Sequence, residues 1–168
     1  TKVKARRLRH LKNPNPDRGK IRQDQQVTIF CNEAQKVNAS IISVKSYDQI
    51  PEIVSEYLRQ HQLPAKIKIA PDPRLKGLDW TAKTSLMVND GRADGDDPVS
   101  VSHAIGGVAE TGTLVMTSGP ESPTSLNFLP LDHIVVVRAE DIAGDYEALW
   151  DRIRQTAADQ GIPGKLPR

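Results

Sequence analysis

Two polar, glycine-containing segments carry residue types that could bind or transform a small anion. The first runs from Ser102 to Glu110-Thr111-Gly112-Thr113, and the second contains Ser118-Gly119. Glycine lets the backbone turn sharply or approach a ligand closely, and threonine hydroxyls can donate to an anion. Glu110 is the one carboxylate of its segment, and a glutamate whose pKa is raised by burial can act as a general acid, general base or nucleophile. We therefore predict Glu110 as catalytic, and as ligand-binding Ser102, Thr111, Gly112, Thr113, Ser118 and Gly119.

Two histidines lie close to these segments. His103 belongs to the first segment, and His133 directly precedes the apolar run Ile134-Val135-Val136-Val137. Either imidazole could supply a general base or a metal ligand, and we include His133 among the ligand-binding residues. No His-x-x-x-His or Cys-x-x-Cys spacing is present, and Cys31 is the single cysteine. The sequence therefore predicts no metal site and no cofactor held by this chain.

Each of these segments also has a purely structural interpretation. Thr111 and Thr113 could stabilise the start of a strand, with Glu110 hydrogen-bonded beside them. The segment after Ser118 could be an ordinary Ser/Pro turn that leads into a short helix at 125–128. Both histidines could be buried and satisfied. The dinucleotide and phosphate-loop glycine patterns are absent, as is a G-x-S-x-G nucleophile elbow, so no nucleotide site or Ser-His-Asp arrangement is predicted.

Composition narrows the class of protein. The 168 residues suit one domain, and 23 basic and 21 acidic side chains leave a formal net charge of +2. Such a balance argues against a protein that grips nucleic acid through its overall field. Eight of the 23 basic side chains lie in residues 1–20, where we expect a basic helix and a linker. No apolar run is long enough to span a bilayer, and the single cysteine suits a reducing cytoplasm, where we expect the protein to lie.

The periodicity of apolar residues predicts the elements that position these segments. Three-to-four spacing predicts helices near 23–37, 48–62 and 146–160. Short β-rich runs predict strands at 39–44, 66–70, 85–88, 99–102, 112–116 and 134–137, the last one covered on both faces. Helices and strands therefore alternate, which favours an α/β fold with a mostly parallel sheet flanked by helices. Ligands of such sheets bind beyond the strand ends.

Two sequence blocks resemble a known family. The blocks are A-E-T-G-T-L-V at 109–115 and L-P-x-x-H-I-V-V-V at 129–137, in this order and spacing. Together they resemble the LUD-domain family, and most closely its lactate utilisation protein C branch. The resemblance covers most of the chain from about Phe30, so we expect residues 21–168 to form one LUD-type domain.

The resemblance implies both a fold and a role. The fold would be that of the NagB/RpiA/CoA transferase-like proteins, and the role would be participation in the oxidation of L-lactate to pyruvate. Iron–sulfur clusters would be carried by partner proteins, in agreement with the lack of cluster ligands here. The alternative is a transferase or isomerase that uses Glu110 on a small carboxylate, a coenzyme A thioester or a phosphorylated substrate. Family members continue past the position of Arg168 into another strand and loop, so we expect this fold to lack its last strands.

Overall fold

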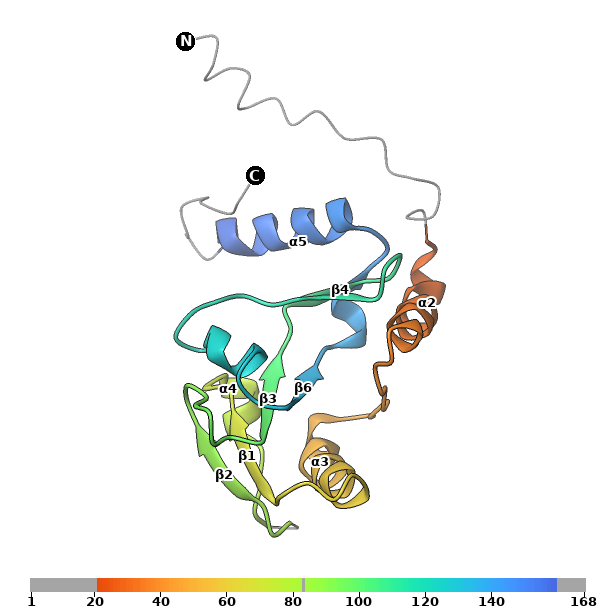
Figure 1. Cartoon of the computed structure of the whole chain (residues 1–168). Helices are drawn as coiled ribbons and strands as arrows, with labels where there is room; N and C mark the ends of the chain where they lie inside the picture. The colour runs from red at the N-terminus through yellow and green to blue at the C-terminus, as the bar shows by residue number, and fades with distance from the viewer. Residues whose placement is uncertain (1–20, 83, 160–168) are drawn as a thin grey trace.

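The computed structural model describes residues 21–82 and 84–159, in which seven strands form two sheets (Figure 1). The larger sheet has the order β2-β1-β3-β6, and each neighbouring pair of its strands is parallel. Its strands are β1 (Lys66–Ile69), β2 (Met87–Asp90), β3 (Val99–His103) and β6 (Asp132–Val136). The prediction of an α/β fold with a parallel sheet flanked by helices is confirmed.

The smaller sheet continues directly from the larger one. It has the order β5-β4-β7, with β4 (Gly106–Val108) antiparallel to β5 (Thr113–Val115) and parallel to β7 (Ile142–Ala143). Only Ala104 and Ile105 separate β3 from β4. The amide of Ala104 donates to the Val136 carbonyl at 2.8 Å, and that of Ile105 donates to the Val115 carbonyl at 2.9 Å. The hydrogen-bond ladder therefore runs from one sheet into the other.

Helices cover both sheets. In Figure 1, α3 lies beside the larger sheet, α2 lies beside β4, and α5 runs across the smaller sheet. The helical elements are α2 (Gln23–Lys36), η2 (Tyr47–Gln49), α3 (Ile50–Gln60), α4 (Pro73–Lys76), η3 (Thr124–Asn127), η4 (Ala139–Asp141) and α5 (Tyr146–Asp159). No helix in residues 21–82 or 84–159 is both long and apolar enough to cross a bilayer.

The main core lies between α3 and the larger sheet. The alternation of β1, Lys-Ile-Lys-Ile, sends Ile67 and Ile69 to one face and the lysines to the other. The two isoleucines are buried in one cluster with Val99 and Val101 of β3 and with the apolar side of α3. Tyr57 of α3 also donates to Asp132 at the start of β6, at 3.1 Å. This packing fixes the side of the sheet on which η2, directly before α3, must lie.

Three local expectations fail, each for a physical reason. Residues 39–44 form no strand, because their side chains lie mostly exposed without a partner strand. No strand is predicted at Gly106-Gly107, but both residues lie in β4. A Cβ on Gly106 would come within 2.6 Å of Leu149 of α5, and one on Gly107 within 2.8 Å of Phe30 of α2, so the strand needs glycine for packing. Strand β6 is half-buried because it is the edge of the described sheet.

The basic helix predicted within residues 1–20 lies outside the described residues. The short helix expected at 125–128 is present as η3.

Candidate functional site

The strand order places a topological switch point between the carboxyl ends of β1 and β3, and at this position an open α/β sheet is expected to have a crevice. The chain leaves β1 toward β2 on one side and leaves β3 toward β6 on the other, so the connections diverge between these two central strands. In open α/β sheets this topological switch point is the position where ligands bind. Asp72 and Arg74 follow the end of β1, and His103 is the last residue of β3. The fold therefore brings three polar side chains to the position that favours a site.

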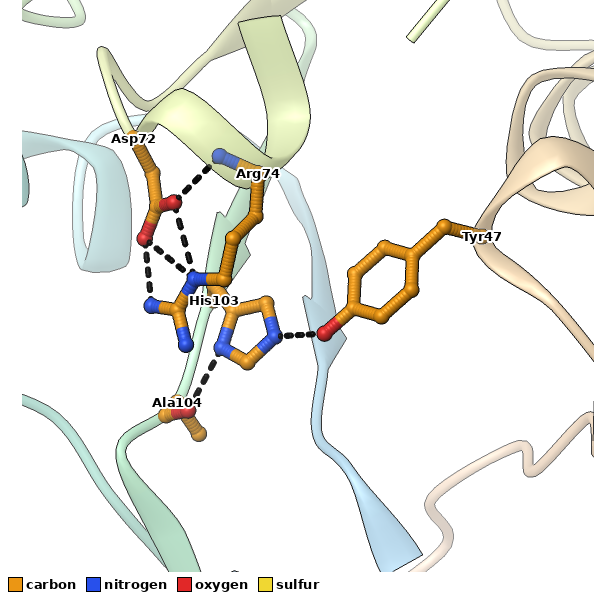
Figure 2. A network of polar contacts seen from close by, with 5 residues as sticks. All are labelled: Tyr47, Asp72, Arg74, His103 and Ala104. Atoms are coloured by element: carbon orange, nitrogen blue, oxygen red, sulfur yellow. Dashed lines mark hydrogen bonds and ion pairs between the residues drawn. The ribbon is translucent and has the colours of Figure 1, made fainter. Parts of the chain in front are cut away.

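His103 joins this position to Tyr47, which precedes it by 56 residues (Figure 2). The Tyr47 hydroxyl lies 2.6 Å from Nε2 of His103, and Nδ1 of His103 lies 2.6 Å from the Ala104 carbonyl oxygen. A carbonyl oxygen only accepts, so Nδ1 carries the proton and donates to it. Tyr47 then donates to Nε2. The two rings are nearly parallel, at 7°.

Arg74 is held in place by Asp72. The Asp72 carboxylate caps α4 by accepting a hydrogen bond from the Arg74 amide at 2.8 Å. It also accepts hydrogen bonds from two side-chain nitrogens of Arg74, Nε at 2.9 Å and Nη2 at 2.5 Å. Figure 2 shows the guanidinium group beside the His103 ring. Among the described residues, none accepts a hydrogen bond from the three other guanidinium N–H groups of Arg74. These three donors are therefore available to an anion.

The electrostatics of the crevice keep His103 neutral. Burial lowers the pKa of His103, and the Arg74 charge lowers it further, against the opposing effects of the Ala104 carbonyl, Asp72 and Asp141. Burial raises the pKa of Tyr47, although Arg74 and Arg138 act in the opposite direction. At neutral pH the pair is therefore a phenol hydrogen-bonded to a neutral imidazole, an arrangement suited to proton exchange.

Asp72 stays ionised beside Arg74. Burial would raise the pKa of the Asp72 carboxyl, but the hydrogen bonds from the Arg74 side chain and amide outweigh it and hold the pKa below its usual range. Arg138, after β6, pairs with Glu140 and leaves its side chain 47% exposed. The carboxylates of the crevice offset its cations, so an anion would be held by directional N–H bonds more than by net charge.

The predicted segment Glu110–Gly112 forms the turn between β4 and β5. The Glu110 amide donates to the Gly144 carbonyl at 3.1 Å. Gly112 has a φ of +64°, and a Cβ there would lie 2.5 Å from the Ala34 amide nitrogen of α2. The glycine is thus explained by close packing against a helix backbone. The catalytic role of Glu110 stays a prediction.

The predicted hydroxyl residues fall into two exposed groups. The hydroxyl oxygens of Thr111 and Thr113 form a hydrogen bond of 2.9 Å. The Tyr146 hydroxyl of α5 donates a second one to the Thr113 hydroxyl, also at 2.9 Å. Ser118 contacts Thr124 at 2.7 Å, while Gly119 and Ser122 exchange two backbone hydrogen bonds of 3.2 and 3.1 Å. The Gly119 and Ser122 amides are therefore already used within that turn. No hydrogen bond among the described residues links the two groups.

Ser102 and His133 are brought together, but on the other face of the sheet. The Ser102 hydroxyl lies 2.5 Å from Nε2 of His133, and Ser102 is fully buried. Alternation along β3 turns Ser102 away from the side that His103 faces. Burial lowers the pKa of His133, which keeps its ring neutral. Ser102 is buried and His133 is half-buried, and their ligand-binding role stays a prediction.

A hollow lies beyond the ends of β1 and β2. It has a volume of about 300 Å³. Lys76 of α4 and Asp90 of β2, two of its lining residues, form an ion pair of 2.7 Å. Four apolar residues complete this part of its lining: Ile69, Leu78, Trp80 and Val88. Tyr47, Asp72, Arg74 and His103 are not among its lining residues.

The sequence contained one usable signal for the crevice. A predicted strand at 66–70 is followed at once by Pro71-Asp72-Pro73-Arg74. This places an acidic and a basic residue at the end of a strand. His103 was recognised as a candidate, but Tyr47, Asp72 and Arg74 were not. Nothing in the linear pattern shows that β1 and β3 are neighbours or that η2 folds back onto them.

Comparisons with known proteins agree with this fold. The family model described as LUD domain matches residues 27–167. The chain is similar to a crystal structure of a DUF162 family protein from Deinococcus radiodurans, with a TM-score of 0.63 and 16% identity, over 85% of this chain and 86% of that chain. A search of curated proteins finds no match. Because the LUD model covers most of the sequence, this chain belongs to the LUD domain family.

Proposed function

We propose that this chain is a lactate utilisation protein C-like subunit, which takes part in the oxidation of L-lactate to pyruvate together with iron–sulfur partner proteins. Membership of the LUD domain family supports this role. In this proposal the crevice between β1 and β3 holds the small carboxylate. The partner proteins carry the clusters and receive the electrons.

One observation carries the proposal: Arg74 presents an immobilised, half-unused guanidinium group at the switch point of the sheet. Asp72 occupies Nε and one N–H of Nη2, which fixes the direction of the remaining donors. A planar fork of this kind matches a carboxylate better than a lysine ammonium would. The His103 ring lies beside the guanidinium group, and Tyr47 contacts the far side of that ring at Nε2 (Figure 2).

The first test replaces the anion-binding group. Arg74→Gln keeps the amide that Asp72 caps but removes the charge, and we expect the Kd for L-lactate to rise roughly tenfold or more, as for the loss of a charged hydrogen bond. Calorimetric titration measures this directly. Arg59→Gln is the matched control, because Arg59 lies on the exposed side of α3, where it forms an ion pair with Glu56. Equal affinities for wild type and Arg74→Gln would remove the proposed site.

A second test separates this role from a transferase or isomerase that uses Glu110. The protein is co-expressed with iron–sulfur lactate-utilisation proteins, and lactate-dependent dye reduction is measured on the purified assembly. Our proposal expects Glu110→Gln to keep wild-type turnover, whereas the alternative requires a loss of at least a hundredfold. An assembly that forms but shows no lactate-dependent reduction would refute the role in lactate oxidation.

A further inference from the structure

Strand β6 has one edge that no other described residue pairs with. It ends the strand order β2-β1-β3-β6, so β3 is its only neighbour in the part of the chain that the structure describes. The run from Ile134 to Val137 contains no charge and no proline, whereas β2, at the other edge of the sheet, ends with Asn89 and Asp90. Charged residues and proline at an edge discourage pairing between molecules. This stretch of β6 lacks that protection.

The direction of the hydrogen bonds identifies the residues of β6 that face the open edge. On the inner side, the Asp132 amide donates to the Pro98 carbonyl at 3.2 Å, and the Val136 carbonyl accepts from the Ala104 amide at 2.8 Å. Peptide groups alternate in direction along a strand, so the even-numbered residues bond to β3 and the odd-numbered ones direct their N–H and C=O groups outward. The outward-facing residues are therefore His133, Val135 and Val137.

We propose that two copies of this chain join through β6, in an antiparallel pair of strands centred on Val135. A two-fold axis at Val135 places His133 of one copy opposite Val137 of the other. Outward-facing residues then meet outward-facing residues, and about six hydrogen bonds join the two strands. This dimer goes beyond the role in lactate oxidation and does not depend on it.

The charges at the two ends of β6 select this register. Asp132 and Arg138 lie equally far from Val135 along the sequence, so each Asp132 comes opposite the Arg138 of the other copy. Asp132 uses Oδ1 to accept from Tyr57, and no described residue bonds to its Oδ2. Arg138 has an extended backbone, and its ion pair with Glu140 leaves guanidinium donors for a second carboxylate. A shift of the register by two residues in either direction removes both opposite-charge contacts.

An exposed apolar segment lies at each end of the proposed strand pair. Phe128, Leu129 and Leu131, directly before β6, are 77%, 51% and 91% exposed. The antiparallel arrangement brings this segment of one copy next to the chain that leaves β6 of the other copy after Arg138. Burial of these side chains adds apolar area, which a pair of strands needs in order to hold a stable dimer.

Sedimentation velocity of the 168-residue chain over a range of concentrations tests the dimer. Wild type should form a dimer that dissociates on dilution. Asp132→Arg and Arg138→Asp each place like charges opposite one another at both ends, and each should raise the dimer Kd roughly tenfold or more. The double variant restores opposite charges and should return toward the wild-type Kd. Asp96→Arg, the same change of charge at an exposed position before β3, is the control and should keep the wild-type Kd.

Amide hydrogen exchange followed by NMR locates the interface on the wild-type chain, without any variant. The amides of His133, Val135 and Val137 should exchange more slowly as the protein concentration rises. The amides of Ile134 and Val136 bond to β3 in both states, so their exchange should change much less. This alternation along one strand distinguishes strand pairing from a dimer that only stacks side chains.

Each other outcome refutes the proposal. A monomer whose outward-facing amides exchange rapidly at all concentrations would show that the edge of β6 stays open. A monomer in which these amides are already protected would show that another segment of the same chain occupies the edge. A dimer that is insensitive to both charge reversals uses another face. None of these results affects the lactate titration of Arg74→Gln, so the two proposals fail separately.

Discussion

Gly112 shows how one residue of a predicted ligand-binding motif serves packing. Its positive φ is unfavourable for residues with a side chain, and an added Cβ would lie 2.5 Å from a backbone atom of α2 that cannot move alone. We expect Gly112→Ala to lower the free energy of unfolding by roughly 2 kcal/mol or more. Urea denaturation measures this. In Gly95→Ala the new Cβ meets open space, so that variant should unfold close to wild type; equal losses in both would contradict the packing explanation.

Single residues also mark the limit of prediction for the site. The motif around Gly112 was conspicuous in the sequence because it combines a carboxylate, hydroxyls and glycine. The Tyr47–His103 contact spans 56 positions and depends on η2 folding against the end of β3. Local pattern carries no information on such a pairing. His103 could be identified as a candidate, but its partners could not.

At the scale of elements, β1 is held by charges on its polar face. Lys66 and Lys68 lie 3.3 and 3.5 Å from Asp97, whose side chain is 2% exposed. Burial would raise the pKa of Asp97, but the Asp94 amide and the two lysines outweigh it, so the pKa lies below its usual range. A lowered pKa means that this carboxylate stabilises the fold above its unfolded pKa and ceases to do so as the pH falls through the folded value.

We expect Asp97→Asn to destabilise the protein by roughly 2 kcal/mol at pH 7, since two partly buried lysines lose their partner. The difference from wild type should shrink below about pH 4, where the wild-type carboxyl is protonated in the unfolded chain and then in the folded one. Urea denaturation at pH 7 and at acid pH gives both values. Asp96→Asn, at the exposed neighbour, serves as control. A difference that is independent of pH would show that packing, not charge, holds Asp97.

Elements with strong periodicity were predictable, and those shaped by tertiary contacts were not. The apolar stripe of α3 and the alternation of β1 are local signals, and both elements form where expected. Strand β4 was missed because Gly106 and Gly107 have low β-propensity, and their place in the sheet is set by Leu149 and Phe30 on either side. The run 39–44 has high β-propensity, but no edge of a sheet receives it.

At the scale of the molecule, the crevice depends on both sheets remaining joined. His103 is the last residue of β3, and β4 begins at Gly106. Any separation of the two sheets would therefore displace the His103 imidazole. Ala104 and Ile105 link the ladders through Val136 and Val115. The clusters around Phe30 and around Leu149 pack on the smaller sheet, while the largest cluster packs on the other. The core of the larger sheet and the core of the smaller sheet are thus joined by the continuous chain of β3 and β4.

This continuity predicts that the described fold unfolds as one unit. The chain has two tryptophans: Trp80 is buried in the larger core, and Trp150 lies on α5 above the smaller sheet. Variants with one tryptophan each, Trp80→Phe and Trp150→Phe, let fluorescence follow one region at a time. Circular dichroism on the same samples follows the whole fold. We expect the fluorescence and dichroism midpoints in urea to coincide within each variant, since separate opening would break the Ala104 and Ile105 hydrogen bonds. Midpoints that differ by more than the experimental error would show two independent units, and a crevice at their junction would then open with the weaker one.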